Sequence, residues 1–238
     1  LSPDALAERF PGLGGGDAME AMAANLGDED ISIFDLGRVK IPAGGGTSWE
    51  VPSLDGTDSV KDLEGVVIAV ISRRSYWETS LDESGGGTPP DCASDDGVIG
   101  RGLYGAGSVL HPSGECATCP MNQWGAESGG GARRKPCSEQ RLSVFLREGD
   151  ILPIIVQLAP TSIAPMRRFN MDLASKRVPH YRAIIKLGLE RQQKQGKPAY
   201  AVVKPSLVQV VDADAGEQLK QLGKQFVQAY QAMTSTAP

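Results

Sequence analysis

The stretch 79–140 restricts the fold more than any other feature of the chain, because it contains no apolar periodicity. It is dense in glycine, proline, aspartate and serine, and a structureless segment of that length is uncommon inside a compact domain. All four cysteines of the chain, Cys92, Cys116, Cys119 and Cys137, lie within it. Something other than an apolar core must therefore order this stretch, and the cysteines are the candidates.

The cysteines follow the spacing C-x23-C-x2-C-x17-C. Structural Zn²⁺ takes four tetrahedral ligands, and a C-x2-C pair in a tight turn supplies two adjacent ones. Metal binding also contributes folding free energy directly. The spacing therefore predicts a structural zinc held by Cys92, Cys116, Cys119 and Cys137. It leaves open an iron–sulfur cluster, a redox-active pair at Cys116 and Cys119, or cysteines without a ligand. His111 is expected to be a loop residue.

Short apolar runs on both sides of this stretch indicate a strand-rich fold. The clearest is Val66–Ile71, which is continuous, β-branched and too short for a buried helix. Glycines at 44–46 predict a hairpin turn between Val39–Ile41 and Trp49–Val51. Further strand-like runs lie at 142–146, 151–158, 181–189, 199–203 and 207–211.

Helical patterns are fewer. Apolar residues three to four apart predict a helix after Pro160, with Thr161 or Ser162 as its cap. An amphipathic helix is expected over 216–233, and two short helices are expected within 1–30. The sum is a β-rich α+β fold, a small β-barrel elaborated by insertions, with an N-terminal arm at 1–30 and a C-terminal helix at 212–238.

The net charge of the whole chain is −5, which by itself argues against a polyanionic partner. The distribution of charge along the chain changes this interpretation. Residues 1–64 hold four basic and thirteen acidic residues, whereas residues 99–211 hold sixteen basic and seven acidic ones. This asymmetry indicates a polyanion partner for the middle of the chain. No apolar run approaches the roughly 20 residues that cross a bilayer, and no targeting segment opens the chain. We therefore expect a cytoplasmic protein without a membrane partner.

Two clusters combine cationic side chains with aromatic rings, although aromatic residues make up only 5% of the chain. Single-stranded nucleic acid binding uses this combination, because the cations follow the phosphates while the rings stack on the bases. The alternative is that the rings pack internally and the cations are solvated. A second basic set, within 167–186, includes the exposed face of the internal helix. The candidate nucleic-acid contacts are Arg73, Arg74, Tyr76, Trp77, Trp124, Arg133, Arg134, Lys135 and Arg141.

The runs 92–100, 116–125, 135–137 and 147–153 resemble those of phage- and mobile-element-encoded proteins regarded as single-stranded DNA-binding proteins with an oligonucleotide-binding (OB) barrel. The resemblance covers roughly 31–211. It implies an OB-like nucleic-acid-binding domain over that range with a zinc-ribbon-like insertion at about 85–140. The chain does not end in the acidic tip that many bacterial single-strand binders use, so recruitment through its C-terminus is not expected.

Together these features predict a non-enzymatic, largely sequence-independent single-stranded DNA-binding protein that acts in phage or mobile-element replication or recombination. Its expected partners are single-stranded DNA, replication or recombination proteins and further copies of the chain. If the protein is phage-encoded, it would act in the cytoplasm of the host cell. Two other classes stay open. One is a zinc-dependent nuclease or nucleic-acid-processing enzyme, with Asp91, Asp95 and Asp96 as the nearest carboxylates. The other is a zinc-stabilised protein-interaction module.

Overall fold

The computed structural model describes residues 3–13, 17–27, 35–79, 89–125, 135–196 and 198–235. The chain divides into two compact units, one formed by residues 1–70 with 142–238 and the other by residues 71–141. We call the first the sheet unit and the second the cysteine unit. Two long strands, β4 (Leu63–Tyr76) and β7 (Ser138–Arg147), each begin in one unit and end in the other.

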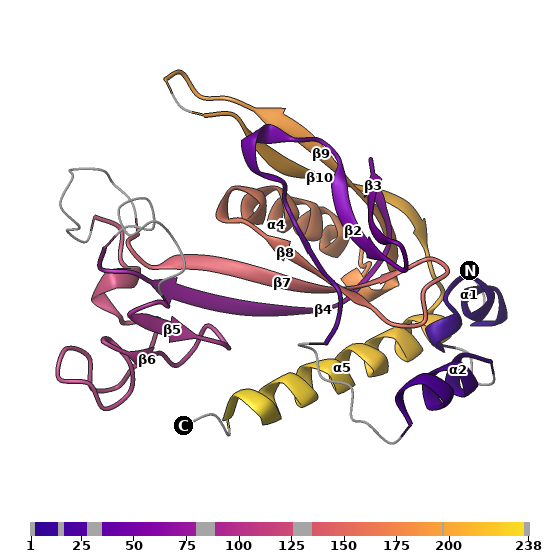
Figure 1. Ribbon diagram of the computed structural model, residues 1–238, viewed down its shortest axis with the longest axis horizontal. Helices are drawn as coiled ribbons and strands as arrows, with labels where there is room; N and C mark the ends of the chain where they lie inside the picture. The colour runs from indigo at the N-terminus through magenta and orange to yellow at the C-terminus, as the bar shows by residue number, and fades with distance from the viewer. Residues whose placement is uncertain are drawn as a thin grey trace. The chain divides into compact units, whose positions relative to one another are not determined.

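The sheet unit is organised around β4, which pairs with β7 and, through its first residues, with β9. β8 lies beside β7, and β1 pairs with β8 in parallel. β9 and β10 form a long antiparallel hairpin with an irregularity between Leu207 and Gln209 (Figure 1). The remaining strands of this unit are β1 (Arg38–Lys40), β2 (Trp49–Ser53), β3 (Gly56–Val60), β8 (Ile154–Leu158), β9 (Ala183–Gln192) and β10 (Tyr200–Val210).

The predicted buried strand at Val66–Ile71 is confirmed as the middle of β4, where every residue but Val70 is buried. A continuous apolar run is what a strand covered on both faces requires. Apolar side chains from the other strands and from the internal helix complete one core. Its members are Val39, Trp49, Val51, Leu63, Val67, Phe145, Ile154, Val156, Leu158, Met166, Leu173, Ala183, Ile185, Leu187 and Val203.

The predicted hairpin between Val39–Ile41 and Trp49–Val51 is wrong. β1 pairs instead with β8, with Val39 opposite Val156, and the glycines form the 3₁₀ turn η2 (Ala43–Gly45). β2 pairs with the strand that follows it, β3. Glycine-rich turns permit a hairpin but do not choose the partner strand. Trp49 is fully buried, and its indole N–H donates to the carbonyl of Leu187 at 2.8 Å, which joins β2 to β9.

The internal helix is confirmed as α4 (Pro160–Ser175), but its expected cap is wrong. Ala159 occupies the cap position and makes no side-chain capping hydrogen bond, while proline begins the first turn. Ser162 is fully buried, and its hydroxyl accepts the backbone N–H of Val203 at 3.0 Å. This serine therefore joins α4 to β10.

The C-terminal amphipathic helix is confirmed as α5 (Ala213–Ser235), with Leu219 and Tyr230 buried. Its first turn is capped by Asp212, whose carboxylate accepts the N–H of Ala215 at 3.0 Å. The helix lies so close to β4 that a Cβ added to Gly223 would stand 2.1 Å from the carbonyl oxygen of Ile68.

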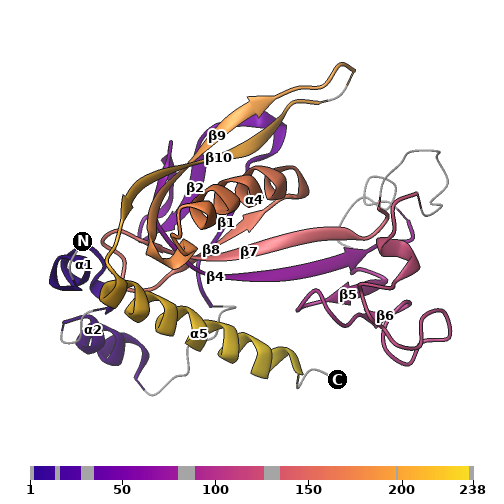
Figure 2. The ribbon, with the colours of Figure 1, turned by 180° about the vertical axis from the view of Figure 1, so that it is seen from behind.

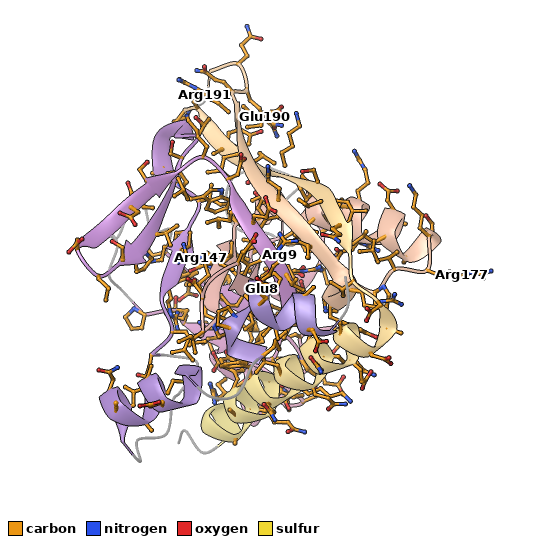
Figure 3. The ribbon with its side chains drawn as sticks, turned by 90° about the vertical axis from the view of Figure 1, so that its right-hand side faces the viewer. Glu8, Arg9, Arg147, Arg177, Glu190 and Arg191 are labelled. Atoms are coloured by element: carbon orange, nitrogen blue, oxygen red, sulfur yellow. The ribbon has the colours of Figure 1, made fainter. Side chains whose placement is uncertain are left out.

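The two short N-terminal helices are confirmed as α1 (Pro3–Arg9) and α2 (Asp17–Leu26), with the 3₁₀ turn η1 (Pro11–Leu13) between them. Leu6 and Phe10 of this segment are fully buried. Figure 3 shows Arg9 among the side chains of the sheet unit, where its guanidinium binds the Glu148 carboxylate at 2.8 Å and Glu64 at 3.5 Å. α1 is thus packed into the sheet unit.

The cysteine unit has little regular structure. It contains the short strands β5 (Cys92–Ser94), which pairs with the end of β4, and β6 (Arg101–Gly102), together with the 3₁₀ turn η3 (Pro120–Asn122). Among its described residues the buried hydrophobic ones are Ile71, Tyr76, Cys116 and Cys119. So small an apolar set contributes little of the burial that orders a domain.

The structure is a mixed α+β fold with a large sheet and a C-terminal helix, as the sequence predicts at that level (Figure 2). In the described part of the chain no pairing between β8 and β10 closes the sheet into a barrel. None of the described helices is both long and apolar enough to cross a membrane.

Candidate metal centre and nucleic-acid interface

The structure brings the four cysteines to the wall of one small cavity within the cysteine unit. The cavity measures about 10 Å³, roughly the space of one water-sized sphere. Cys92 lies in β5, Cys116 and Cys119 lie in the turn before η3, and Cys137 immediately precedes β7. None of the four forms a disulfide. Residues that are far apart in sequence therefore share one site.

Backbone hydrogen bonds hold the C-x2-C turn and the last cysteine in place. Cys116 donates its N–H to the carbonyl of Val98 at 2.7 Å, and Cys137 donates to the carbonyl of Met121 at 2.9 Å. A Cβ added to Gly100 would lie 3.2 Å from the sulfur of Cys92, so the backbone approaches that thiol closely. The turn and the strand ends thus bring Cys92, Cys116 and Cys137 to the cavity through local backbone contacts.

Burial raises the pKa of three of these thiols. It raises the pKa of Cys92 and of Cys116, and it raises the pKa of Cys137 to about 11. The charge of Arg74 acts in the opposite direction on Cys116 and Cys137. A metal ion can bind here only by displacing protons, because the thiolate is the ligand.

The described residues include no group of three or more histidine, cysteine, aspartate or glutamate side chains arranged as a set of metal ligands. The four thiols nevertheless line the same cavity. Four sulfur donors at an ion-sized cavity match the donor set of structural zinc. His111 does not line the cavity, and its ring nitrogen lies 2.9 Å from the carbonyl oxygen of Glu115, as a loop residue would.

Arg74 and Asn122 connect the cavity to its surroundings. Nη1 of Arg74 donates to Oδ1 of Asn122 at 2.7 Å, and the Asn122 amide donates to the carbonyl of Cys116 at 2.6 Å. Lys135 also approaches Oδ1 of Asn122, at 3.4 Å. Asn122 matches no ligand or nucleic-acid-binding pattern in the sequence, and the one signal for it is its place two residues after Pro120, in the turn that follows Cys119.

Two other candidate arginines, Arg73 and Arg141, form ion pairs. Arg73 binds Asp95 at 2.6 Å, and Arg101 contacts the same carboxylate. Arg141 binds Glu139 at 3.1 Å. The side chains of Arg73 and Arg141 are 31% and 28% exposed, so these ion pairs do not exclude the nucleic-acid contacts predicted for them.

The three carboxylates considered for a catalytic metal each have a structural partner. Asp91 accepts the N–H of Glu78 at 2.7 Å, and Asp95 binds the two arginines. Asp96 accepts the N–H groups of Val98 and Ile99, and despite the opposing effect of its burial, these bonds lower the pKa of its carboxyl. Each carboxylate thus binds a backbone N–H group or an arginine within the cysteine unit.

The aromatic candidates separate into internal and exposed rings. Tyr76 is buried on the cavity wall and meets Tyr104 edge-on at 5.5 Å, and Trp77 is half-buried. Trp124 is 74% exposed, and the ammonium of Lys135 lies 5.9 Å from the centre of its ring. The structure therefore presents one aromatic–cation pair to solvent beside the cysteine turn.

Two candidates, Arg133 and Arg134, lie outside the described residues. In the second basic set Arg167, Arg168, Lys176 and Arg177 are exposed on or just after α4, as expected for a helix face, and Figure 3 shows Arg177 directed outward.

Comparison with protein-family models, with curated proteins and with solved structures finds no match to the chain.

Proposed function

We propose that the chain is a non-enzymatic, largely sequence-independent single-stranded DNA-binding protein with an OB-like domain and a structural zinc centre. The observation that carries the proposal is the exposed ring of Trp124 with the ammonium of Lys135 above it. An exposed ring can stack on any base, and an adjacent cation can meet the phosphate that follows.

The connectivity of the sheet supports the OB-like part of the proposal. Three strands, β4, β7 and β8, are followed by α4 and then by β9 and β10, and β4 pairs with both β7 and β9. An OB fold is a partly open five-stranded barrel with this succession, and the loops between its first two and its last two strands contact oligonucleotides. By this correspondence the cysteine unit is an insertion between the first two strands, and the last loop is the connection between β9 and β10.

Zinc would be held by Cys92, Cys116, Cys119 and Cys137. When bound, the ion supplies the folding free energy that the cysteine unit lacks in apolar burial. The chain's own contribution is to hold Cys116 and Cys119 next to η3. Cys119 lies only five residues before Trp124. The centre would thereby keep the exposed ring in a defined position. A role in replication or recombination of a phage or mobile element, with proteins of those processes as partners, completes the proposal.

The test is a titration of a labelled oligonucleotide at two salt concentrations, read by fluorescence anisotropy. We expect affinity to fall steeply with salt, because binding several phosphates releases counterions. Trp124→Ala should lose about 1–3 kcal/mol of binding free energy if the ring stacks on a base. Val109→Ala is the matched control, since Val109 is 96% exposed in the same unit but has no ring.

Three outcomes contradict the proposal: binding unchanged by salt, equal affinity for duplex, or a Trp124→Ala protein that binds as tightly as the control. A protein-interaction module predicts no DNA binding at all. A Mg²⁺-dependent cleavage assay on single-stranded DNA separates a binding protein from a nuclease, which would shorten the oligonucleotide.

A further inference from the structure

Arg74 occupies an unusual position for a residue expected to contact DNA. Its side chain is 18% exposed and lines the same cavity as the four cysteines. Its Nε is buried and has no hydrogen-bond partner among the described residues. A buried polar atom without a partner is uncommon in folded proteins, and each case calls for a physical reason.

Among the described residues, Arg74 has one carboxylate within ion-pair distance, and it shares that carboxylate with a second arginine. Nη1 donates to the neutral amide oxygen of Asn122, and the carboxylate of Glu139 lies 3.6 Å from Nη2. Glu139 is shared with Arg141, which approaches it more closely, at 3.1 Å. Burying a cation is costly unless it is paired, so a further anionic group beside Arg74 would account for its position.

We infer that Arg74 is the charge partner of the cysteine centre: its guanidinium, with the unpartnered Nε, faces the thiolates and offsets their negative charge. The inference rests on the zinc centre proposed above. A Zn²⁺ ion held by four thiolates carries a formal net charge of about −2. In a buried site such a charge requires compensation, and the side chains around metal ligands commonly provide it. Arg74 is thus a positioning residue for the metal centre and not a phosphate contact.

The neighbouring residue Arg73 supplies the matched control. It follows Ser72 in β4 just before Arg74, so its side chain leaves the opposite face of the strand, and it binds Asp95. It does not line the cysteine cavity. Arg73→Met and Arg74→Met remove the same charge from adjacent positions of one strand, and only the second removes it from the cavity.

The experiment is a competition between the full-length protein and a chromophoric chelator for Zn²⁺, without DNA. We expect Arg74→Met to weaken zinc binding by about 10- to 100-fold, as loss of a residue that supports metal ligands does. Arg74→Lys should weaken it less, since it keeps the charge but loses Nε. Arg73→Met should bind zinc like the wild type. The thiolate-to-metal absorption bands of the Co²⁺-loaded protein should shift in the Arg74 variants alone.

Zinc affinity and Co²⁺ spectra equal to wild type in both Arg74 variants would overturn the inference. So would unchanged zinc affinity together with a salt slope of DNA binding reduced by about 1, because that is the signature of a lost phosphate contact. Where circular dichroism shows that Arg74→Met does not fold, Arg74→Lys decides by the same criteria. Failure here leaves the salt titration of DNA binding unaffected, so the two proposals fail separately.

Discussion

At the scale of single residues, the chemistry of each side chain depends on what it meets. The arginines at 73 and 74 are adjacent in sequence, yet one binds a carboxylate and the other lines the cysteine cavity. Arg9 binds the carboxylates of Glu148 and Glu64 and the side chain of Gln209. The same residue type thus pairs with carboxylates at two positions and lines the cysteine cavity at a third.

The pair between Arg9 and Glu148 leads to a pH-dependent prediction. The hydrogen bond from Arg9 lowers the pKa of Glu148, so its contribution to stability is present above pH 4.5 and is lost as pH falls through the lowered value. Because Glu148 is 45% exposed, we expect less than about 1 kcal/mol. Glu148→Gln should lower the free energy of unfolding at pH 7 by that amount, and the difference from wild type should vanish in acid.

Urea unfolding at pH 7 and in acid measures this difference. Glu8→Gln is the control, because Glu8 is an exposed carboxylate in α1, the helix that contains Arg9 (Figure 3). A deficit of the same size at both pH values would show that the ionised carboxylate is not the cause.

At the scale of elements, close backbone approaches decide how helices meet strands. α5 carries two glycines whose surroundings differ. An added Cβ at Gly223 would meet the Ile68 carbonyl at 2.1 Å, whereas one at Gly216 would meet the Arg182 side chain at 2.4 Å. Backbone cannot move aside without distorting β4, but a long side chain can change rotamer.

We therefore predict that two alanine substitutions in α5 differ in their effect on stability. Gly223→Ala should destabilise the protein by about 1–3 kcal/mol, because it overpacks a helix against a strand. Gly216→Ala should be close to neutral, since up to about 1 kcal/mol of helix propensity offsets the displacement of Arg182. Chemical denaturation measures both variants. Equal stability of the two would mean that α5 does not depend on its contact with β4.

At the scale of the whole molecule, the two units differ in what can stabilise them. The sheet unit contains the extended apolar core, whereas the described part of the cysteine unit buries four hydrophobic residues, of which two are cysteines. Order in the second unit must come largely from its turns and, on our proposal, from the metal.

Metal removal should therefore act on one unit only. We expect a zinc chelator to expose residues 71–141 of the full-length protein to limited proteolysis, while fragments from the sheet unit survive. Adding zinc back should restore protection. Mass spectrometry of the fragments locates the cuts. Identical cleavage with and without chelator would contradict a structural metal in this unit.

Much of the architecture could be predicted from local patterns. Strand β4, strands β7 and β8, helix α4 and helix α5 lie where apolar periodicity indicates them, because periodicity reports which face of an element is buried. The cysteine spacing likewise identified the residues that share one cavity. The OB-like barrel, the zinc and the DNA contacts remain predictions.

Contacts between distant parts of the chain could not be predicted in the same way. Val39 pairs with Val156 rather than with a local strand, Ser162 bonds to Val203 rather than capping its own helix, and Arg74 lies against the cysteines. Each outcome depends on which segments tertiary folding brings together and on which buried polar groups then need partners. Local sequence thus specifies which elements form and which faces they bury, whereas tertiary packing decides which partner each face and each buried charge meets.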